Sequence, residues 1–262
     1  MALSIAGGAA LKGVRMSKAP AGFDPVTFWS GYQGGFWDFT NPANLFADAA
    51  LTTPATLNSP GDVRGVTDLS GLGNKIVTSA LSAFTMRSGY CESYTGGLAM
   101  ASAISIGYYT AVALVRISTI GSLQNIVDSD YGTGNRVSQN LIITTSGYLE
   151  SYIFGYSSPA VVMSSPALST GVDYILASAV DNTSADLVAV GTVYNSGSLG
   201  SPSGGVVPVA VGASYGGTLT PGYQQFTGRI YCAAHITKKC TIAEIQDIGN
   251  YMNSLAGTSA VV

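Results

Sequence analysis

Apolar and polar residues alternate in parts of this chain, and an alternation of period two is typical of half-buried β-strands. The clearest example is the stretch 228–236. There Ile230, Cys232 and Ala234 fall on one side of the predicted strand and His235 falls on the other. The pattern therefore predicts that Cys232 points into the core and that His235 is an exposed structural residue.

One helix is predicted directly after this strand. Thr241 stands three residues before Glu244, so the two side chains can each bond a free N–H of the first helical turn. Apolar residues then recur at spacings of three and four, at Ile242, Ile245, Ile248, Met252 and Leu255. Gly257 follows as the predicted C-cap. We expect one short C-terminal helix whose apolar stripe packs on a β body.

The other predicted strands recur at intervals of about 8 to 15 residues with turn residues between them, which is typical of a β-sandwich. They are 63–69, 76–82, 97–100, 108–117, 125–128, 137–144, 148–154, 160–163, 173–181, 186–194 and 206–213, and the strand described above is expected to extend over 225–236. Because residues 109–117 are almost all apolar, we expect them to form a central strand covered on both faces. The fold class predicted from this pattern is all-β.

Several motifs resemble those of laminin-G-like, concanavalin A-like jelly-roll domains from phage and prophage virion proteins. They are LFADAALTTPAT at 45–56, DLSGLGN at 68–74, the apolar strand at 109–117, and a strand, turn and T-x-x-E-I helix at the end. The resemblance covers roughly residues 36–257. It implies a β-sandwich jelly roll at residues 36–262, with one short C-terminal helix, preceded by an N-terminal arm or attachment segment at residues 1–35.

The same resemblance implies a role as a virion structural protein on the surface of a phage particle, either a capsid decoration protein or a tail or fibre component. Its partners would be other virion proteins and its own copies, with host surface glycans as further contacts. A glycan-binding adsorption protein of the tail is the alternative. A glycoside hydrolase of the same fold is a third reading.

Charge excludes two classes of partner. Only 10% of the 262 residues are charged, the formal net charge is −3, and lysine and arginine form no cluster in the sequence. We therefore expect neither a nucleic acid nor an anionic membrane as a partner. No apolar run of about 18 residues is present, so no membrane-spanning segment is predicted either.

Aromatic residues crowd the stretch 23–39, with glycines between them. Aromatic faces can stack on sugar rings, which makes Trp29, Tyr32 and Trp37 the candidate glycan-binding residues. Large aromatic residues in β proteins are also commonly buried, because burial removes a large apolar surface from water. A core or subunit-interface role for the same three residues therefore stays open.

Paired carboxylates, which glycoside hydrolysis requires, are absent from any one predicted strand. The three glutamates are far apart in sequence, and His235 is the only histidine. We therefore predict no catalytic residues and no enzyme activity. Asp128 and Asp130 share a glycine-rich loop that is either a hairpin turn or a Ca²⁺ site, and no other cofactor is expected.

Three cysteines, Cys91, Cys232 and Cys240, make an odd count without a metal-like spacing. A full disulfide framework is therefore excluded, and we predict three free thiols.

Overall fold

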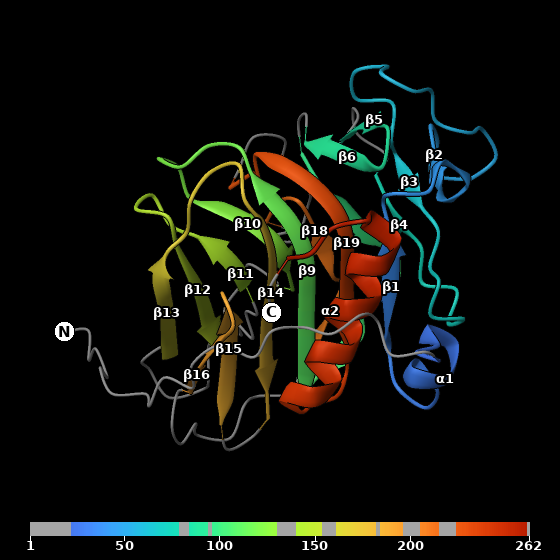
Figure 1. The fold of residues 1–262 in the computed structure, drawn as a ribbon. Coiled ribbons are helices and arrows are strands. Elements are labelled where there is room, and N and C mark those ends of the chain that lie inside the picture. Colours follow the sequence, from blue (N-terminus) through green and yellow to red (C-terminus); the bar gives the residue numbers. More distant parts are fainter. Residues whose placement is uncertain are drawn as a thin grey trace.

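The alternating strands pair as two antiparallel sheets that face each other across one apolar core (Figure 1). The computed structural model describes residues 22–78, 84–93, 96–129, 140–153, 161–181, 184–195, 205–214 and 224–260. Within these residues the all-β sandwich prediction is confirmed. No helix of the described chain is long and apolar enough to cross a membrane.

We call the sheet that carries the C-terminal helix sheet A, and its inner face is the one turned toward the other sheet. In order across sheet A the strands are β16 (Thr192–Asn195), β15 (Ala185–Ala189), β14 (Asp173–Val180), β9 (Tyr109–Ile117), β19 (Gly228–Ile236), β6 (Tyr90–Ser93) and β5 (Phe84–Arg87), with β1 (Gly34–Asp38) also paired to β19.

The opposing sheet B contains shorter strands. In order they are β13 (Val161–Ala167), β12 (Tyr148–Ile153), β11 (Asn140–Ile143), β10 (Gln124–Asp128), β18 (Ala210–Val211), β7 (Leu98–Met100), β4 (Ile76–Val77), β3 (Gly65–Val66) and β2 (Leu45–Phe46). A separate pair joins β17 (Gly205–Val207) to β8 (Ile104–Ile106), and a 3₁₀ turn, η1, covers Pro42–Asn44.

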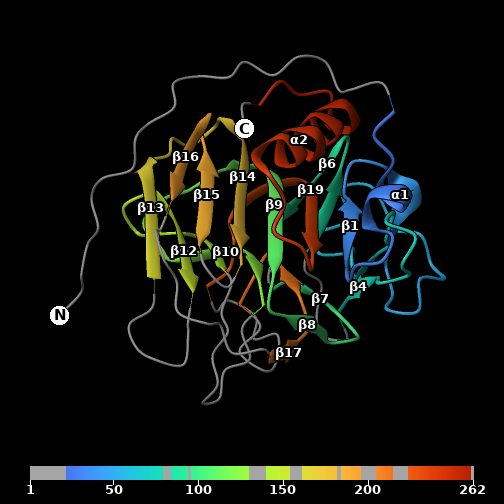
Figure 2. The same ribbon diagram turned by 90° about the horizontal axis from the view of Figure 1, so that it is seen from below.

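The helix α2 (Ile242–Ala256) lies along β9 and β19 on the outer face of sheet A (Figures 1 and 2). Its capping box is present as predicted. The Thr241 backbone N–H donates to Glu244 Oε2 at 2.8 Å, and the Glu244 N–H donates to Thr241 Oγ1 at 3.3 Å. Gly257 ends the helix in the left-handed conformation, with φ of 65°. A second apolar cluster therefore forms between sheet A and α2.

A β-bulge in β19 corrects the orientation predicted for its side chains. The pairing of β19 with β9 shifts register between Ile230 and Cys232. The shift places Cys232 in the apolar cluster beneath α2 and moves the following residues to the opposite parity. His235 is fully buried and stacks on Tyr109, with ring centroids 5.9 Å apart. The prediction of an exposed histidine is therefore wrong.

The N-terminal boundary predicted between residues 35 and 36 falls inside β1. The short helix α1 (Pro25–Trp29), capped by Asp24, packs against β1, so both elements belong to the sandwich. The Trp29 Nε1–H donates to the His235 carbonyl oxygen at 2.9 Å. A Cβ on Gly34 would lie 2.0 Å from that oxygen, so only glycine fits there. Residues 1–21 of the predicted arm lie outside the described residues.

Some strands differ from their predicted limits. The predicted strand at 186–194 is a hairpin, β15 and β16, because Val190 and Gly191 both take positive φ and reverse the chain. The strands β1, β5 and β6 were not predicted at all. Each is short and lies next to glycine-containing turns, which hide a period-two pattern.

All three cysteines have free thiols, as predicted, and all three are buried.

Acidification is expected to destabilise the native state through His235. Burial lowers the pKa of this imidazole from 6.5 to about 3. Between these two pH values the unfolded chain binds a proton that the native state does not bind. The free energy of unfolding therefore decreases as the pH is lowered, by at most about 1.4 kcal/mol per pH unit. Above pH 6.5 the histidine is neutral in both states, and the loss disappears.

Urea unfolding of the wild type and of the variant His235→Phe, at about pH 7 and about pH 4.5, measures this effect. The variant keeps an aromatic ring beside Tyr109 and removes the group that titrates. The variant should lose less stability on acidification than the wild type. Equal losses would show that other groups carry the acid sensitivity.

Candidate functional site

Two groups of charged side chains occupy opposite ends of the same strands on the outer face of sheet A. Apolar residues of β9, β14 and β19 lie between them beneath α2. One group lies where β19 leads into α2, and the other lies where β19 begins and β9 ends. Their contacts decide which of them is available to a ligand.

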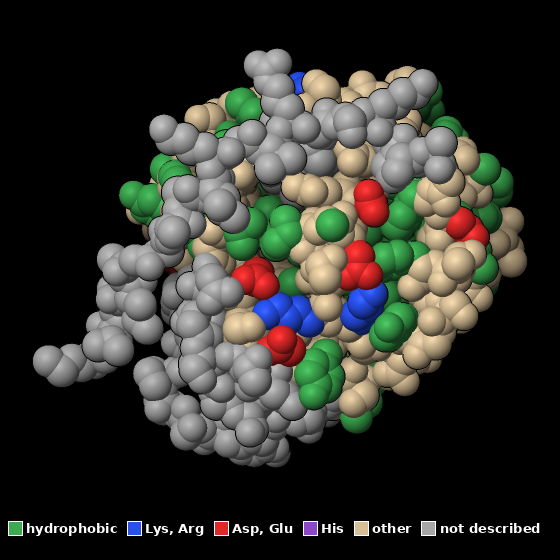
Figure 3. Space-filling view, turned by 60° about the horizontal axis from the view of Figure 1, so that its bottom comes forward, with side chains coloured by type: hydrophobic (Ala, Val, Ile, Leu, Met, Phe, Trp, Pro, Cys, Tyr) green, Lys and Arg blue, Asp and Glu red, His purple; other side chains and the backbone are tan. Residues whose placement is uncertain are grey.

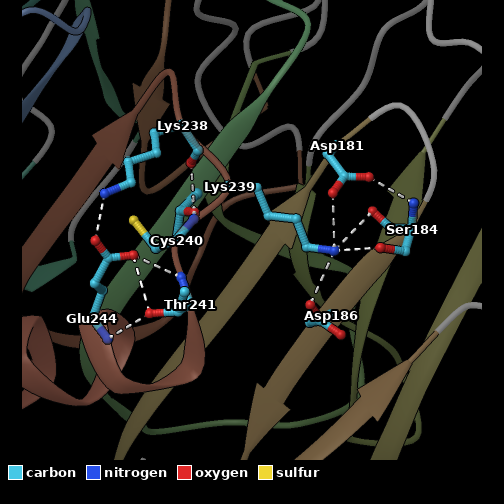
Figure 4. Close-up of polar contacts among 9 residues, drawn as sticks. Asp181, Ser184, Asp186, Lys238, Lys239, Cys240, Thr241 and Glu244 are labelled. Carbon is cyan, nitrogen blue, oxygen red and sulfur yellow. Dashed lines mark hydrogen bonds and ion pairs between the residues drawn. The ribbon is translucent and has the colours of Figure 1, made fainter.

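We define the lysine cluster as Asp181, Ser184, Asp186, Lys238, Lys239 and Glu244. Lys239 Nζ lies 3.4 Å from Asp181 Oδ2 and 3.2 Å from Asp186 Oδ2, and it also donates to the carbonyl oxygen and hydroxyl of Ser184 (Figure 4). These partners surround the ammonium group. Lys239 therefore links the turn before α2 to the end of β14 and the start of β15.

The neighbouring Lys238 has a similar role at the start of α2. Its ammonium group pairs with Glu244 and lies 5.2 Å from the ring centre of Phe28 and 5.5 Å from that of Tyr32. Burial alone would raise the pKa of Glu244, but the hydrogen bonds from Lys238 and from the Thr241 backbone outweigh burial and lower it. Figure 3 shows basic and acidic side chains side by side on this face, next to hydrophobic ones.

All charges named in the lysine cluster are paired with one another. The pairs join α1, α2 and the β14–β15 connection, which lie far apart in the sequence. Their physical effect is to hold the helix start against the sheet. We therefore assign the lysine cluster a structural role.

The second group forms a single row across four strands, which we call the arginine row: Glu92, Arg229, Arg116 and Asp173. Arg229 of β19 lies directly opposite Glu92 of β6 on one side and Arg116 of β9 on the other. Arg116 lies opposite Asp173 of β14. Directly opposite residues project to the same face of a sheet, so the charge order along the row is negative, positive, positive, negative.

One end of the row is a closed ion pair. Arg116 Nε donates to Asp173 Oδ1 at 2.7 Å, and its Nη2 donates to Oδ2 at 2.6 Å. The Tyr231 hydroxyl donates to Asp173 Oδ1 at 3.0 Å. Burial raises the pKa of Asp173, but the hydrogen bonds from Arg116 and Tyr231 outweigh it, so the net shift is downward. Asp173 is therefore an ionised partner of Arg116.

The other end is closed by an arginine from β5. Arg87 donates to Glu92 Oε2 from Nε at 3.0 Å and from Nη2 at 2.8 Å, and its Nη1 donates to Asn58 Oδ1 at 3.0 Å. The Glu92 side chain is 42% exposed. Its carboxylate is thus paired on one side and open to solvent on the other.

Arg229, in the middle of the row, has a different environment. Its guanidinium carbon lies 4.4 Å from the ring centre of Tyr90, and the ring of Tyr231 lies 6.0 Å from that of Tyr90. Both Arg229 and Tyr90 are partly exposed. Among the residues that the structure describes, Arg229 forms no ion pair. It is a stacked, solvent-accessible cation, and we take it as the centre of the candidate site.

The aromatic residues predicted to bind glycans lie elsewhere. Trp29 and Trp37 are fully buried, because each indole fills the apolar core and donates its N–H to a backbone carbonyl, of His235 and Asn74 respectively. Neither ring can stack on a sugar, and the core alternative holds for both. Tyr32 is 38% exposed, but its ring faces Lys238.

The predicted Ca²⁺ pair lies only partly within the described residues. Asp128 is fully buried at the end of β10, and Asp130 lies outside the described residues. No group of three histidine, cysteine, aspartate or glutamate side chains that could hold a metal ion is found in the described part of the chain.

Sequence reasoning missed the arginine row because its members come from strands that are distant in the sequence. Arg87 and Tyr90 flank a Ser88-Gly89 turn, and this short-hairpin signal would have revealed β5 and β6. No sequence pattern gives the register that places Glu92 opposite Arg229.

The comparisons with known proteins identify the fold and no family. No protein-family model and no curated protein matches the sequence. A sialidase from Trypanosoma rangeli matches with a TM-score of 0.58 and 10% sequence identity, over 92% of this chain and 36% of that chain. The carbohydrate-binding module CBM40 of Ruminococcus gnavus IT-sialidase, bound to α2,3-sialyllactose, matches with a TM-score of 0.44 and 17% identity, over 58% of this chain and 95% of that chain.

The sialidase matches contradict the prediction that the chain is not an enzyme, since these proteins share its fold over 92% and 84% of its length and are glycoside hydrolases. That prediction relied on the absence of neighbouring carboxylates in the sequence. Strand pairing brings residues from distant parts of the sequence together, as it does for Glu92 and Arg229, so the absence of neighbouring carboxylates in the sequence does not exclude catalysis. At 10% identity the likeness shows the fold alone, and it assigns no catalytic residue.

Removing Lys239 should destabilise the protein, because its ammonium group is the shared partner of Asp181 and Asp186. We expect Lys239→Met to lower the free energy of unfolding by about 1–3 kcal/mol in urea denaturation. Lys75→Met is the matched control: Lys75 Nζ contacts the Ala49 carbonyl oxygen at 3.1 Å. The control should cost less than about 0.5 kcal/mol. Equal midpoints for the wild type and Lys239→Met would refute the structural role.

Proposed function

We propose that this chain is a carbohydrate-binding β-sandwich domain that holds saccharides on the arginine row. The observation that supports the proposal is the partly exposed Arg229 guanidinium, which stacks on Tyr90 and lacks an ion-pair partner among the described residues. A guanidinium group held in this way can donate hydrogen bonds to acceptor oxygens of a ligand.

The residues around Arg229 suit a saccharide. Sugar hydroxyls both donate and accept hydrogen bonds, so a binding surface needs fixed donors beside fixed acceptors. Arg229 supplies donors, and the exposed Glu92 carboxylate directly opposite supplies an acceptor. The row lies on a sheet, which positions side chains more accurately than a loop does.

The fold agrees with this proposal. One of the matching solved structures is the Trypanosoma rangeli sialidase in complex with sialic acid, with a TM-score of 0.57. Because its sequence identity is 10% and the chain spans 36% of that protein, the match supplies a shared architecture. The ligand class is argued from the arginine row itself.

Isothermal titration or NMR titration with a panel of bacterial and animal glycans tests the proposal. Arg229→Ala should weaken the binding of any saccharide found by about ten- to a hundredfold, because a charge-assisted hydrogen bond contributes about 1.5–3 kcal/mol. Lys75→Ala removes a positive charge outside the row and should bind like the wild type. Binding that Arg229→Ala leaves intact would place the sugar site elsewhere.

The virion role implied by the sequence resemblance stays a prediction. We propose it as the setting in which a weak sugar site would act, since many copies on one particle raise avidity without new contacts.

Mass spectrometry of purified phage particles from the source of the sequence tests this setting. The protein should be present in stoichiometric amounts and accessible to antibodies on intact particles. Its absence from particles would refute the virion role and would leave the carbohydrate-binding proposal untouched.

A further inference from the structure

We infer that the arginine row selects saccharides that carry a carboxylate group, and that Arg229 receives this carboxylate. The inference rests on the proposed function, because it names the ligand class of the same site. Three observations support it: the balance of charges around the row, the stacked position of Arg229, and the commitment of both neighbouring carboxylates to other arginines.

The charges around the row leave one positive charge uncompensated. Arg87, Arg116 and Arg229 face two carboxylates, Glu92 and Asp173. Like charges directly opposite each other on neighbouring strands are destabilising, and Arg229 and Arg116 stand in that relation. An anion bound at Arg229 would relieve this repulsion.

Neither carboxylate of the row forms an ion pair with Arg229, although the charge of Arg229 is among the causes that lower the pKa of Asp173. Asp173 is held by two hydrogen bonds from Arg116 and a third from Tyr231. Glu92 accepts two hydrogen bonds from Arg87. Arg87 and Arg116 each donate hydrogen bonds from one planar edge of the guanidinium group to a carboxylate. Arg229 has no carboxylate in this position among the described residues.

The stacking on Tyr90 prepares Arg229 for a planar acceptor. A guanidinium group that lies over an aromatic ring keeps its N–H donors around its edge, where a carboxylate can accept two parallel hydrogen bonds. The ring also restricts side-chain rotation before the ligand arrives, which lowers the entropic cost of binding. A sulfate ester can also accept two hydrogen bonds from this edge, but it spreads one negative charge over three oxygens, whereas a carboxylate concentrates that charge on two.

Matched pairs of acidic and neutral sugars test the inference with the full chain: methyl glucuronide with methyl glucoside, methyl galacturonide with methyl galactoside, and sialyllactose with lactose. We expect at least one acid to bind at least tenfold more tightly than its neutral partner in NMR titrations. The preference should shrink as salt concentration rises, because the site is exposed.

Variants of Arg229 identify the receiving group. Arg229→Gln should abolish the preference for the acid, and Arg229→Lys, which keeps the charge and loses the planar fork, should restore only part of it. Thermal unfolding checks that both variants fold, and Lys75→Gln should keep the full preference. A preference that survives in Arg229→Gln overturns the assignment of Arg229.

The remaining outcomes separate the two proposals. Equal binding of acids and neutral sugars overturns this inference and leaves the proposed function standing. Glucose 6-sulfate bound as tightly as methyl glucuronide overturns the selection of carboxylates. Failure of every saccharide to bind overturns both proposals.

Discussion

The structure depends on β19, which is paired on both edges and buried on both faces. It pairs with β9 along one edge and with β1 and β6 along the other. Its inner face contributes Ile230 and Ala233 to the core between the sheets, and its outer face contributes Cys232 and Ala234 to the cluster beneath α2. One strand thus joins both apolar layers, and its bulge lets consecutive residues serve the same layer.

The few charged residues of the chain are arranged with respect to this strand. At its C-terminal end the lysine cluster pairs its cations with carboxylates and locks α2 onto the sheet. At its N-terminal end the arginine row and the adjacent Arg87 together place three arginines beside two carboxylates. The same residue types therefore serve stability at one end and form the candidate ligand site at the other, where Arg229 has no carboxylate as an ion-pair partner among the described residues.

The fold does not decide between binding and catalysis. The chain shares its architecture with a sialidase over nearly its whole length while spanning about a third of that enzyme. Residues that meet on a sheet come from distant parts of the sequence, so neither function can be excluded by searching for neighbouring carboxylates. Function therefore depends on the contacts of particular side chains, such as that of Arg229 with Tyr90, and the fold alone does not define it.

The sequence by itself determined the fold class, the α2 helix with its Thr241 and Glu244 cap, and the free cysteines, because these depend on local periodicity, local hydrogen bonds and composition. Tertiary structure decided the burial of Trp29, Trp37 and His235, since burial depends on which surfaces meet. It also decided the site. The pairing of Glu92 with Arg229 follows from strand register, and register is set by packing of the whole sandwich and by a bulge that no local pattern announces.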